Sequence, residues 1–182
     1  MVDSVLGADV KWHHIPLDGA YEFIDLPSKG REPFAKIFTI FTKAENYPVL
    51  VHCSGGRDRT GTLAFLLNGL LGVAEDDLCR DWESSVFSTK GMDFMSAKMN
   101  RLLSYLNTMP GETIQTRIEA YVKGCGVTDA EIAAFRAIML RSATRRERTA
   151  TISLARFSLF CLRNLVFCVC THSVSCAIIL YI

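Results

Sequence analysis

The chain has 182 residues, a formal net charge of +1 and 49% hydrophobic residues. This length suits one domain with a sizeable core, and so small a net charge lacks the basic surface typical of nucleic-acid-binding proteins. Before residue 160 the cysteines are Cys53, Cys79 and Cys125, whose spacing fits free thiols better than a disulfide framework or a zinc site. Free thiols suit a reducing, cytoplasmic location.

The first predicted element is an extended run that includes His13 and His14. Its neighbours His13 and His14 point to opposite faces of an extended run, so a structural role is favoured over a metal pair. Residues 47–52 are short, apolar and β-branched, which predicts a buried strand, and residues 62–71 are helix-forming. The residues between these two elements are therefore expected to form a cradle between a strand and a helix.

Four further helices are expected in the second half. They cover residues 75–88, with acidic residues in the first turn; residues 92–109, with Met95, Met99, Leu102, Leu103 and Leu106 at helical spacing; residues 113–124; and residues 128 to about 140, opened by a capping box of Thr128 and Glu131. With strands early and helices late, the expected fold is α/β, with a short, mainly parallel central sheet flanked by helices and a helix-rich C-terminal half.

The cradle holds Cys53 and Arg59, separated by five residues of which two are glycine. A thiol that faces a helix N-terminus and backbone N–H groups becomes a thiolate, so Cys53 is the expected nucleophile. Gly55 and Gly56 let the loop turn its N–H groups toward the oxygens of a phosphate. Arg59 offers a planar fork to two of those oxygens as charge spreads in the transition state. The pattern indicates phosphoryl transfer through a covalent thiol intermediate, without a metal or other cofactor.

Three neighbours have expected supporting roles. The Thr60 hydroxyl can donate to the Cys53 sulfur, which favours the thiolate and eases its departure. His52 is expected to hydrogen-bond the loop backbone and not to act as a base. Arg57 is a second cation that can contact another phosphate, or a solvated loop charge.

The run from His52 to Gly61 resembles the signature loop of cysteine-dependent protein tyrosine phosphatases. More narrowly, it is similar to the atypical, mostly microbial branch whose loop reads HCxxGKDRTG, with Arg57 in place of the usual Lys. Further likeness at residues 70–73, 81–85, 118–121 and 126–132 extends the resemblance over roughly residues 10–141. It implies a phosphatase-like fold and a phosphate-binding set of Ser54, Gly55, Gly56, Arg57, Asp58 and Arg59.

The general acid has two candidates. A positioned carboxylic acid that protonates the leaving group contributes about 10²–10⁴-fold to the rate. Asp58 is favoured, because it lies inside the cradle as in the branch with the Asp-Arg pair; its structural alternative is a salt bridge that stiffens the loop. Asp18 is the second candidate, because residues 14–18 resemble the acid-bearing segment of dual-specificity phosphatases; its alternative is a turn residue. Asp25 ranks third.

The substrate class stays open between phosphotyrosine proteins, which are favoured, and phosphoinositides. The second cation, Arg57, suits a substrate with more than one phosphate, and the loop locally resembles that of myotubularin-like lipid phosphatases. Rhodanese-type sulfurtransferases also place a Cys in a loop closed by an Arg before a helix. Their pattern lacks the His-Cys opening and the Asp-Arg-Thr-Gly ending found here, so a sulfurtransferase is disfavoured. A catalytically dead, phosphate-binding module is the alternative outside the enzyme classes.

Two domain-level expectations concern the ends of the chain. Residues 1–141 are expected to form the catalytic domain, which is N-terminally short because family members usually begin with an additional strand and helix. Residues 142–182 form an Arg-rich linker and an apolar tail that holds four of the seven cysteines. The tail is interpreted as a C-terminal membrane anchor or as an extension foreign to the fold.

Overall fold

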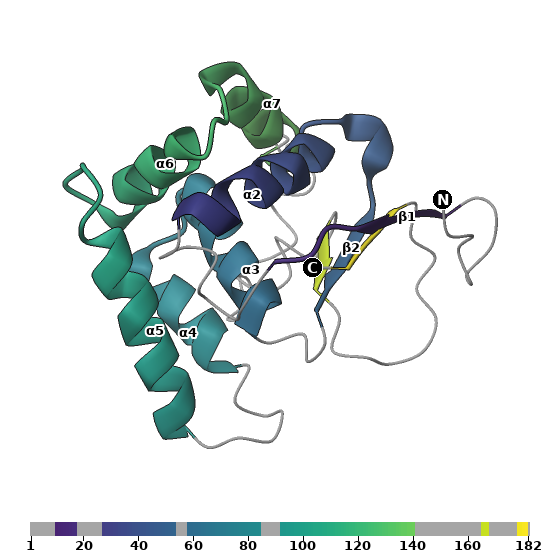
Figure 1. The fold of residues 1–182 in the computed structure, drawn as a ribbon. Coiled ribbons are helices and arrows are strands. Elements are labelled where there is room, and N and C mark those ends of the chain that lie inside the picture. The colour runs from purple at the N-terminus through teal and green to yellow at the C-terminus, as the bar shows by residue number, and fades with distance from the viewer. Residues whose placement is uncertain are drawn as a thin grey trace, which may run out of the picture.

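The structure is a computed structural model that describes residues 10–17, 27–53, 58–84, 92–140, 165–167 and 178–181. It is helix-rich with few strands, consistent with the predicted phosphatase-like α/β class (Figure 1). In chain order the elements are β1 (Lys11–His14), α2 (Pro27–Phe41), η1 (Ala44–Asn46), β2 (Val49–His52), α3 (Asp58–Leu70), α4 (Glu75–Ser84), α5 (Met92–Leu106), α6 (Ile114–Gly124), α7 (Asp129–Met139), β3 (Leu165–Phe167) and β4 (Ile178–Tyr181).

The described strands pair in the order β1-β4-β2-β3, and each neighbouring pair is parallel. In β2 the side chains of Val49 and Val51 are fully buried, whereas those of Leu50 and His52 are half-buried. This period of two anchors one face of β2 in the core. The carboxyl end of β2 is consequently fixed where the predicted nucleophile follows.

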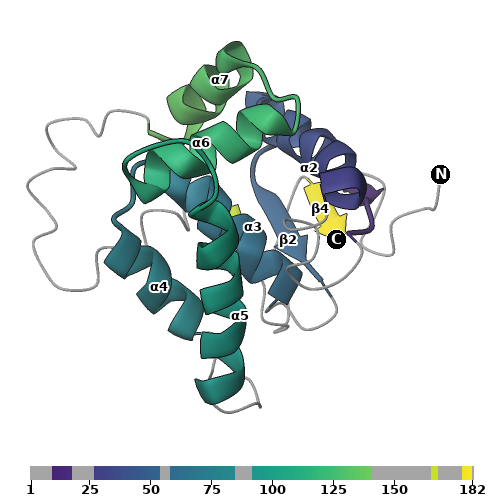
Figure 2. The same cartoon turned by 60° about the vertical axis from the view of Figure 1, so that its left-hand side comes forward.

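Two segments of the predicted tail belong to this sheet. Strand β4 lies between β1 and β2, and β3 lies on the other side of β2. Figure 2 shows β4 beside β2. Neither interpretation of the tail predicted this pairing, because a short apolar run reads alike as a buried strand or as part of a membrane span. In the part of the chain that the structure describes, no helix is both long enough and apolar enough to span a membrane.

Helix α3 lies between the strands and helices α4, α5 and α6, and it contacts α4 and α6 (Figures 1 and 2). Every residue of α3 from Thr62 to Leu70 is buried. A helix that is apolar on all sides belongs inside a domain, and the predicted helix after the cradle is confirmed in that position. Its first residue is Asp58, four residues before the predicted start, because the acidic side chain suits a first turn and the Thr62 hydroxyl donates to the Asp58 carbonyl oxygen (2.8 Å).

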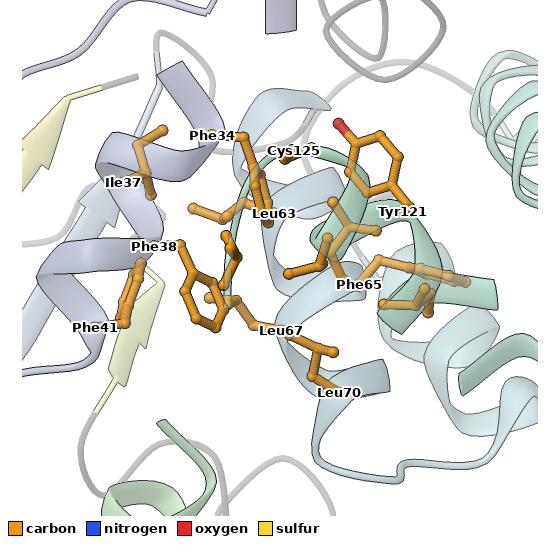
Figure 3. Packing of buried hydrophobic residues seen from close by; sticks show 14 of the residues in the cluster. Phe34, Ile37, Phe38, Phe41, Leu63, Phe65, Leu67, Leu70, Tyr121 and Cys125 are labelled. Atoms are coloured by element: carbon orange, nitrogen blue, oxygen red, sulfur yellow. The ribbon is translucent and has the colours of Figure 1, made fainter. Parts of the chain in front are cut away.

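Helix α2 was not predicted. Phe34, Phe38 and Phe41 lie on one helical face, but Pro27, Gly30 and Pro33 are helix breakers that mask this periodicity. The tertiary structure overrides the breakers because the aromatic face is buried. Figure 3 shows Phe34 and Phe38 pointing toward the α3 side chains Leu63 and Leu67.

Aromatic side chains join α2 to α6 and α7. Phe34 meets Tyr121 of α6 edge to face, with ring centroids 5.7 Å apart. Phe38 and Phe41 both contact Phe135 of α7, at centroid distances of 5.4 and 6.4 Å. We call these five residues the aromatic cluster. It joins an early helix to the last helix before residue 141.

The four later helices are confirmed with small differences in their bounds. Helix α5 ends at Leu106, three residues early, and the predicted end of the helix at residue 88 lies outside the described residues. The capping box that opens α7 is present: the Glu131 backbone N–H donates to Thr128 Oγ1 (3.2 Å), and the Thr128 N–H donates to Glu131 Oε2 (2.8 Å). Thr113 caps α6 in the same way, through Thr116.

Gly111, in the turn before α6, is expected to tolerate no side chain. Its φ is +138°, and a Cβ there would lie 2.5 Å from Thr116 Oγ1 and 3.0 Å from the backbone nitrogen of Arg117. Gly111→Ala should therefore lower the free energy of unfolding by more than about 1 kcal/mol, measured by urea denaturation. The matched control is Gly124→Ala at the end of α6, where a Cβ meets nothing within 4 Å. That variant should be neutral or slightly stabilising, and equal losses in both would contradict the steric explanation.

Candidate active site

Cys53 follows the last residue of β2 and is 5% exposed within the hydrophobic core cluster. Its neighbour His52 directs Nδ1 toward the Cys53 carbonyl oxygen at 3.3 Å, so a ring protonated at Nδ1 donates to the loop backbone. The His52 ring also lies 5.9 Å from the Trp12 ring of β1, centroid to centroid. The supporting role of His52 in the loop stays a prediction. Because Cys53 directly follows β2, it lies at the carboxyl end of a parallel strand, where ligands of α/β proteins usually bind.

Helix α3 begins at Asp58, five residues after Cys53. Arg59 is partly buried in its first turn, and Thr60 is 1% exposed. Within the described part of the chain, Thr60 Oγ1 has no hydrogen-bond partner, so the predicted donation to the Cys53 sulfur is not formed. Burying a hydroxyl without a hydrogen-bond partner costs free energy. A bound anion or a thiolate beside Thr60 would supply the missing acceptor.

Several predicted site residues lie outside the described part of the chain. They are Asp18, Asp25, Ser54, Gly55, Gly56 and Arg57. Leu17, which precedes Asp18, is 2% exposed and belongs to the core cluster. The structure thus brings Cys53, Asp58, Arg59 and Thr60 to one strand–loop–helix connection. Among the residues it describes, no group of His, Cys, Asp and Glu could hold a metal ion.

Asp58 forms a salt bridge with Lys98 of α5. Lys98 Nζ lies 2.6 Å from Asp58 Oδ1, and the two side chains are 11% and 22% exposed. The salt bridge that was the structural alternative for Asp58 is thus present, while its role as an acid stays a prediction. Lys98 was not predicted as a site residue. The available signal was a lysine at helical spacing from Met95 and Leu102, inside the apolar stripe of the helix.

Trp82 of α4 packs against the first turns of α3. Its ring is 2% exposed and meets Phe65 edge to face, with centroids 6.4 Å apart. A Cβ on Gly61 would lie 3.6 Å from this ring, so the small residue after Thr60 lets the indole approach the helix backbone. The tryptophan in one of the segments that carry the family resemblance therefore braces the helix that bears Arg59.

The far end of α3 is held by α7. Arg136 Nε donates to the Leu70 carbonyl oxygen (2.8 Å), one of the last carbonyls of α3, and Arg136 Nη2 pairs with Glu119 Oε2 (2.8 Å). Hydrogen bonds from Lys123 and Arg136 lower the pKa of Glu119. The carboxylate therefore stays ionised at neutral pH and keeps the guanidinium in place. Helix α3 is consequently fixed at both ends.

The other described cysteines are poor competitors for Cys53. Cys79 and Cys125 are free thiols. Burial raises the pKa of Cys125 to about 11, and burial together with the charges of Glu75 and Glu83 raises the pKa of Cys79. Since the thiolate is the nucleophilic form, both side chains are mainly unreactive thiols at neutral pH.

The chain is similar in sequence to a protein named as a putative phosphatase. It is 41% identical over 61 residues to a Cupriavidus necator protein named "Putative tyrosine-protein phosphatase", and the match covers 34% of this chain and 22% of that relative. The chain thus spans about a fifth of the length of the curated relative it matches. No solved structure gives a significant match. The sequence model described as the tyrosine phosphatase family matches residues 17–141, which include Cys53, Asp58 and Arg59, and the chain belongs to that family.

Proposed function

We propose that the chain is a phosphatase that hydrolyses phosphomonoesters through a phosphocysteine on Cys53, with phosphotyrosine proteins as its substrates. The observation that carries the proposal is the position of Cys53 directly after β2, with Asp58 and Arg59 opening α3, inside the segment matched by the family. A strand that delivers a thiol to the N-terminus of a buried helix is suited to binding and attacking a phosphate.

In the proposed reaction the Cys53 thiolate attacks phosphorus, and an S–P bond forms as the P–O bond to the leaving group breaks. The leaving oxygen takes a proton from the general acid, for which Asp58 is favoured over Asp18. Water then attacks the phosphocysteine and gives a proton to the carboxylate left by the general acid, the S–P bond breaks, and phosphate leaves with the thiolate restored. Arg59 and the loop N–H groups hold the charge of the phosphoryl oxygens in both steps.

The test compares a phosphotyrosine peptide with a water-soluble phosphoinositide as substrates of the full chain. Turnover of the peptide, with a phosphate adduct trapped on the Cys53 peptide by acid quench and detected by mass spectrometry, is the expected result. Faster turnover of the phosphoinositide would assign the second substrate class, for which Arg57 supplies the extra cation. Phosphate binding without turnover or adduct would instead identify a binding module, and the proposed function would be wrong.

Asp58→Asn is expected to slow a tyrosyl phosphate far more than an activated aryl phosphate such as dinitrophenyl phosphate. A general acid matters most when the leaving group is poor, so the loss on the tyrosyl phosphate should approach about 10²-fold. The measurement is kcat/KM on both substrates. Equal losses would assign Asp58 a structural role as the partner of Lys98 and would make Asp18 the acid, which Asp18→Asn then checks.

A further inference from the structure

The ion pair between Lys98 and Asp58 is more deeply buried than the other ion pairs of the described helices. In the pair between Lys36 and Glu32 the side chains are 63% and 79% exposed, whereas those of Lys98 and Asp58 are 11% and 22% exposed. Exposed pairs contribute little, because water screens both charges. An ammonium removed from water needs a fixed anionic partner, so Lys98 holds the Asp58 carboxylate in one place.

The negative charge of the Asp58 carboxylate is unfavourable in a site that binds a phosphate dianion. Its carboxylate lies one residue before Arg59, at the helix end that the phosphate dianion is proposed to face. An uncompensated carboxylate there repels the dianion, and it also competes with it for the Arg59 guanidinium and the N–H groups of the helix end. A cation 2.6 Å from Asp58 Oδ1 removes both effects.

We infer that Lys98 is a positioning residue of the phosphate site: it holds the Asp58 carboxylate on the α5 side and compensates its charge, so that the loop accepts a phosphate dianion. The inference rests on the proposed function for its ligand, but it concerns anion binding and not turnover. It concerns the ionised form of Asp58, which is the form that pairs with Lys98. If Asp58 is the general acid, the inference applies to the state in which its proton has been given up. It gives helix α5 a direct influence on the site.

The test measures the affinity of the full chain for inorganic vanadate and the KM for an activated aryl phosphate. Lys98→Met should weaken vanadate binding and raise KM by about tenfold, the effect of an uncompensated charge several ångströms from the anion, with a smaller change in kcat. Lys98→Arg, which keeps the cation, should restore most of the affinity. In an Asp58→Asn background, Lys98→Met should change the affinity by less than about twofold, because the charge that Lys98 compensates is gone.

Lys123→Met is the matched control. Lys123 also pairs with two carboxylates, Glu119 and Asp129, but it is 42% exposed and lies on α6. This variant should bind vanadate as the unmodified chain does. If Lys98→Met prevents folding, judged by circular dichroism, the Asp58→Asn/Lys98→Met double variant buries no unpaired charge and is compared with Asp58→Asn.

The outcomes separate this inference from the proposed function. Vanadate affinity of folded Lys98→Met within twofold of the unmodified chain would overturn the inference and leave the proposed function standing. An equal further loss from Lys98→Met in the Asp58→Asn background would overturn it as well, because Lys98 would then act on the anion directly. A third outcome is that the variants lose vanadate affinity as predicted but the unmodified chain shows no turnover. That outcome would support the inference and contradict the proposed enzymatic function.

Discussion

Cys53→Ser is expected to abolish hydrolysis of a small aryl phosphate, with kcat reduced by at least about 10³-fold. A serine hydroxyl keeps its proton at neutral pH, whereas Cys53 is proposed to react as a thiolate that forms the S–P bond. The affinity for inorganic phosphate should change only modestly, because Arg59 and the loop N–H groups bind the anion without the sulfur. The measurements are steady-state turnover and calorimetric titration with phosphate.

Cys79→Ser is the matched control for this variant. Cys79 is also a free thiol, but burial and the nearby acidic side chains raise its pKa, so its loss should leave turnover unchanged. Near-normal turnover by Cys53→Ser would reject the covalent mechanism. Loss of phosphate binding along with turnover would show instead that the substitution had disrupted the loop.

Phe135→Ala should produce the largest loss of stability, about 3–5 kcal/mol. Phe135 is fully buried and contacts both Phe38 and Phe41, so truncation leaves a cavity between α7 and α2 that the surrounding rings cannot fill. Natural domains are stable by only about 5–15 kcal/mol, so the variant is expected to be partly unfolded at moderate urea concentrations. The measurement is the free energy of unfolding from urea denaturation followed by far-ultraviolet circular dichroism.

Phe135→Leu keeps most of the apolar volume and loses the aromatic edge contacts. We expect it to cost clearly less than Phe135→Ala, because the cavity is smaller. Ala133→Ser, at an exposed position of α7, should be close to neutral and controls for changes in the helix itself. Similar losses for the Leu and Ala variants would indicate that ring geometry, and not volume, holds α7 against α2.

The elements predicted correctly from the sequence are those whose signal lies within a few neighbouring residues. Strand β2, the helix after the cradle and the capping box of Thr128 and Glu131 each follow from a pattern within a few residues, and all three are present. Helix α2 was missed because Pro27, Gly30 and Pro33 are local signals against a helix, whereas the burial of its aromatic face depends on elements that are distant in sequence.

The sequence predicted the kind of candidate site, a phosphate-binding one, but not the side chains from other helices that surround it. The spacing of Cys53 and Arg59 follows from the chemistry of phosphate binding, but no local pattern shows that Lys98 reaches Asp58, which lies 40 residues away in the sequence. The packing of Trp82 on Gly61 and the hydrogen bond from Arg136 to Leu70 are likewise contacts between helices. The roles of the loop residues themselves stay predictions.

The aromatic cluster limits how early the chain can complete its core during synthesis on the ribosome. Translation adds about 5–20 residues per second from the N-terminus, so α2 leaves the ribosome well before Tyr121 and Phe135 have been synthesised. During that interval the apolar face of α2 lacks the rings that cover it in the folded protein. Exposed apolar surface on a nascent chain attracts chaperones and other unfinished chains. The aromatic face of α2 is therefore completed only after α6 and α7 have been synthesised.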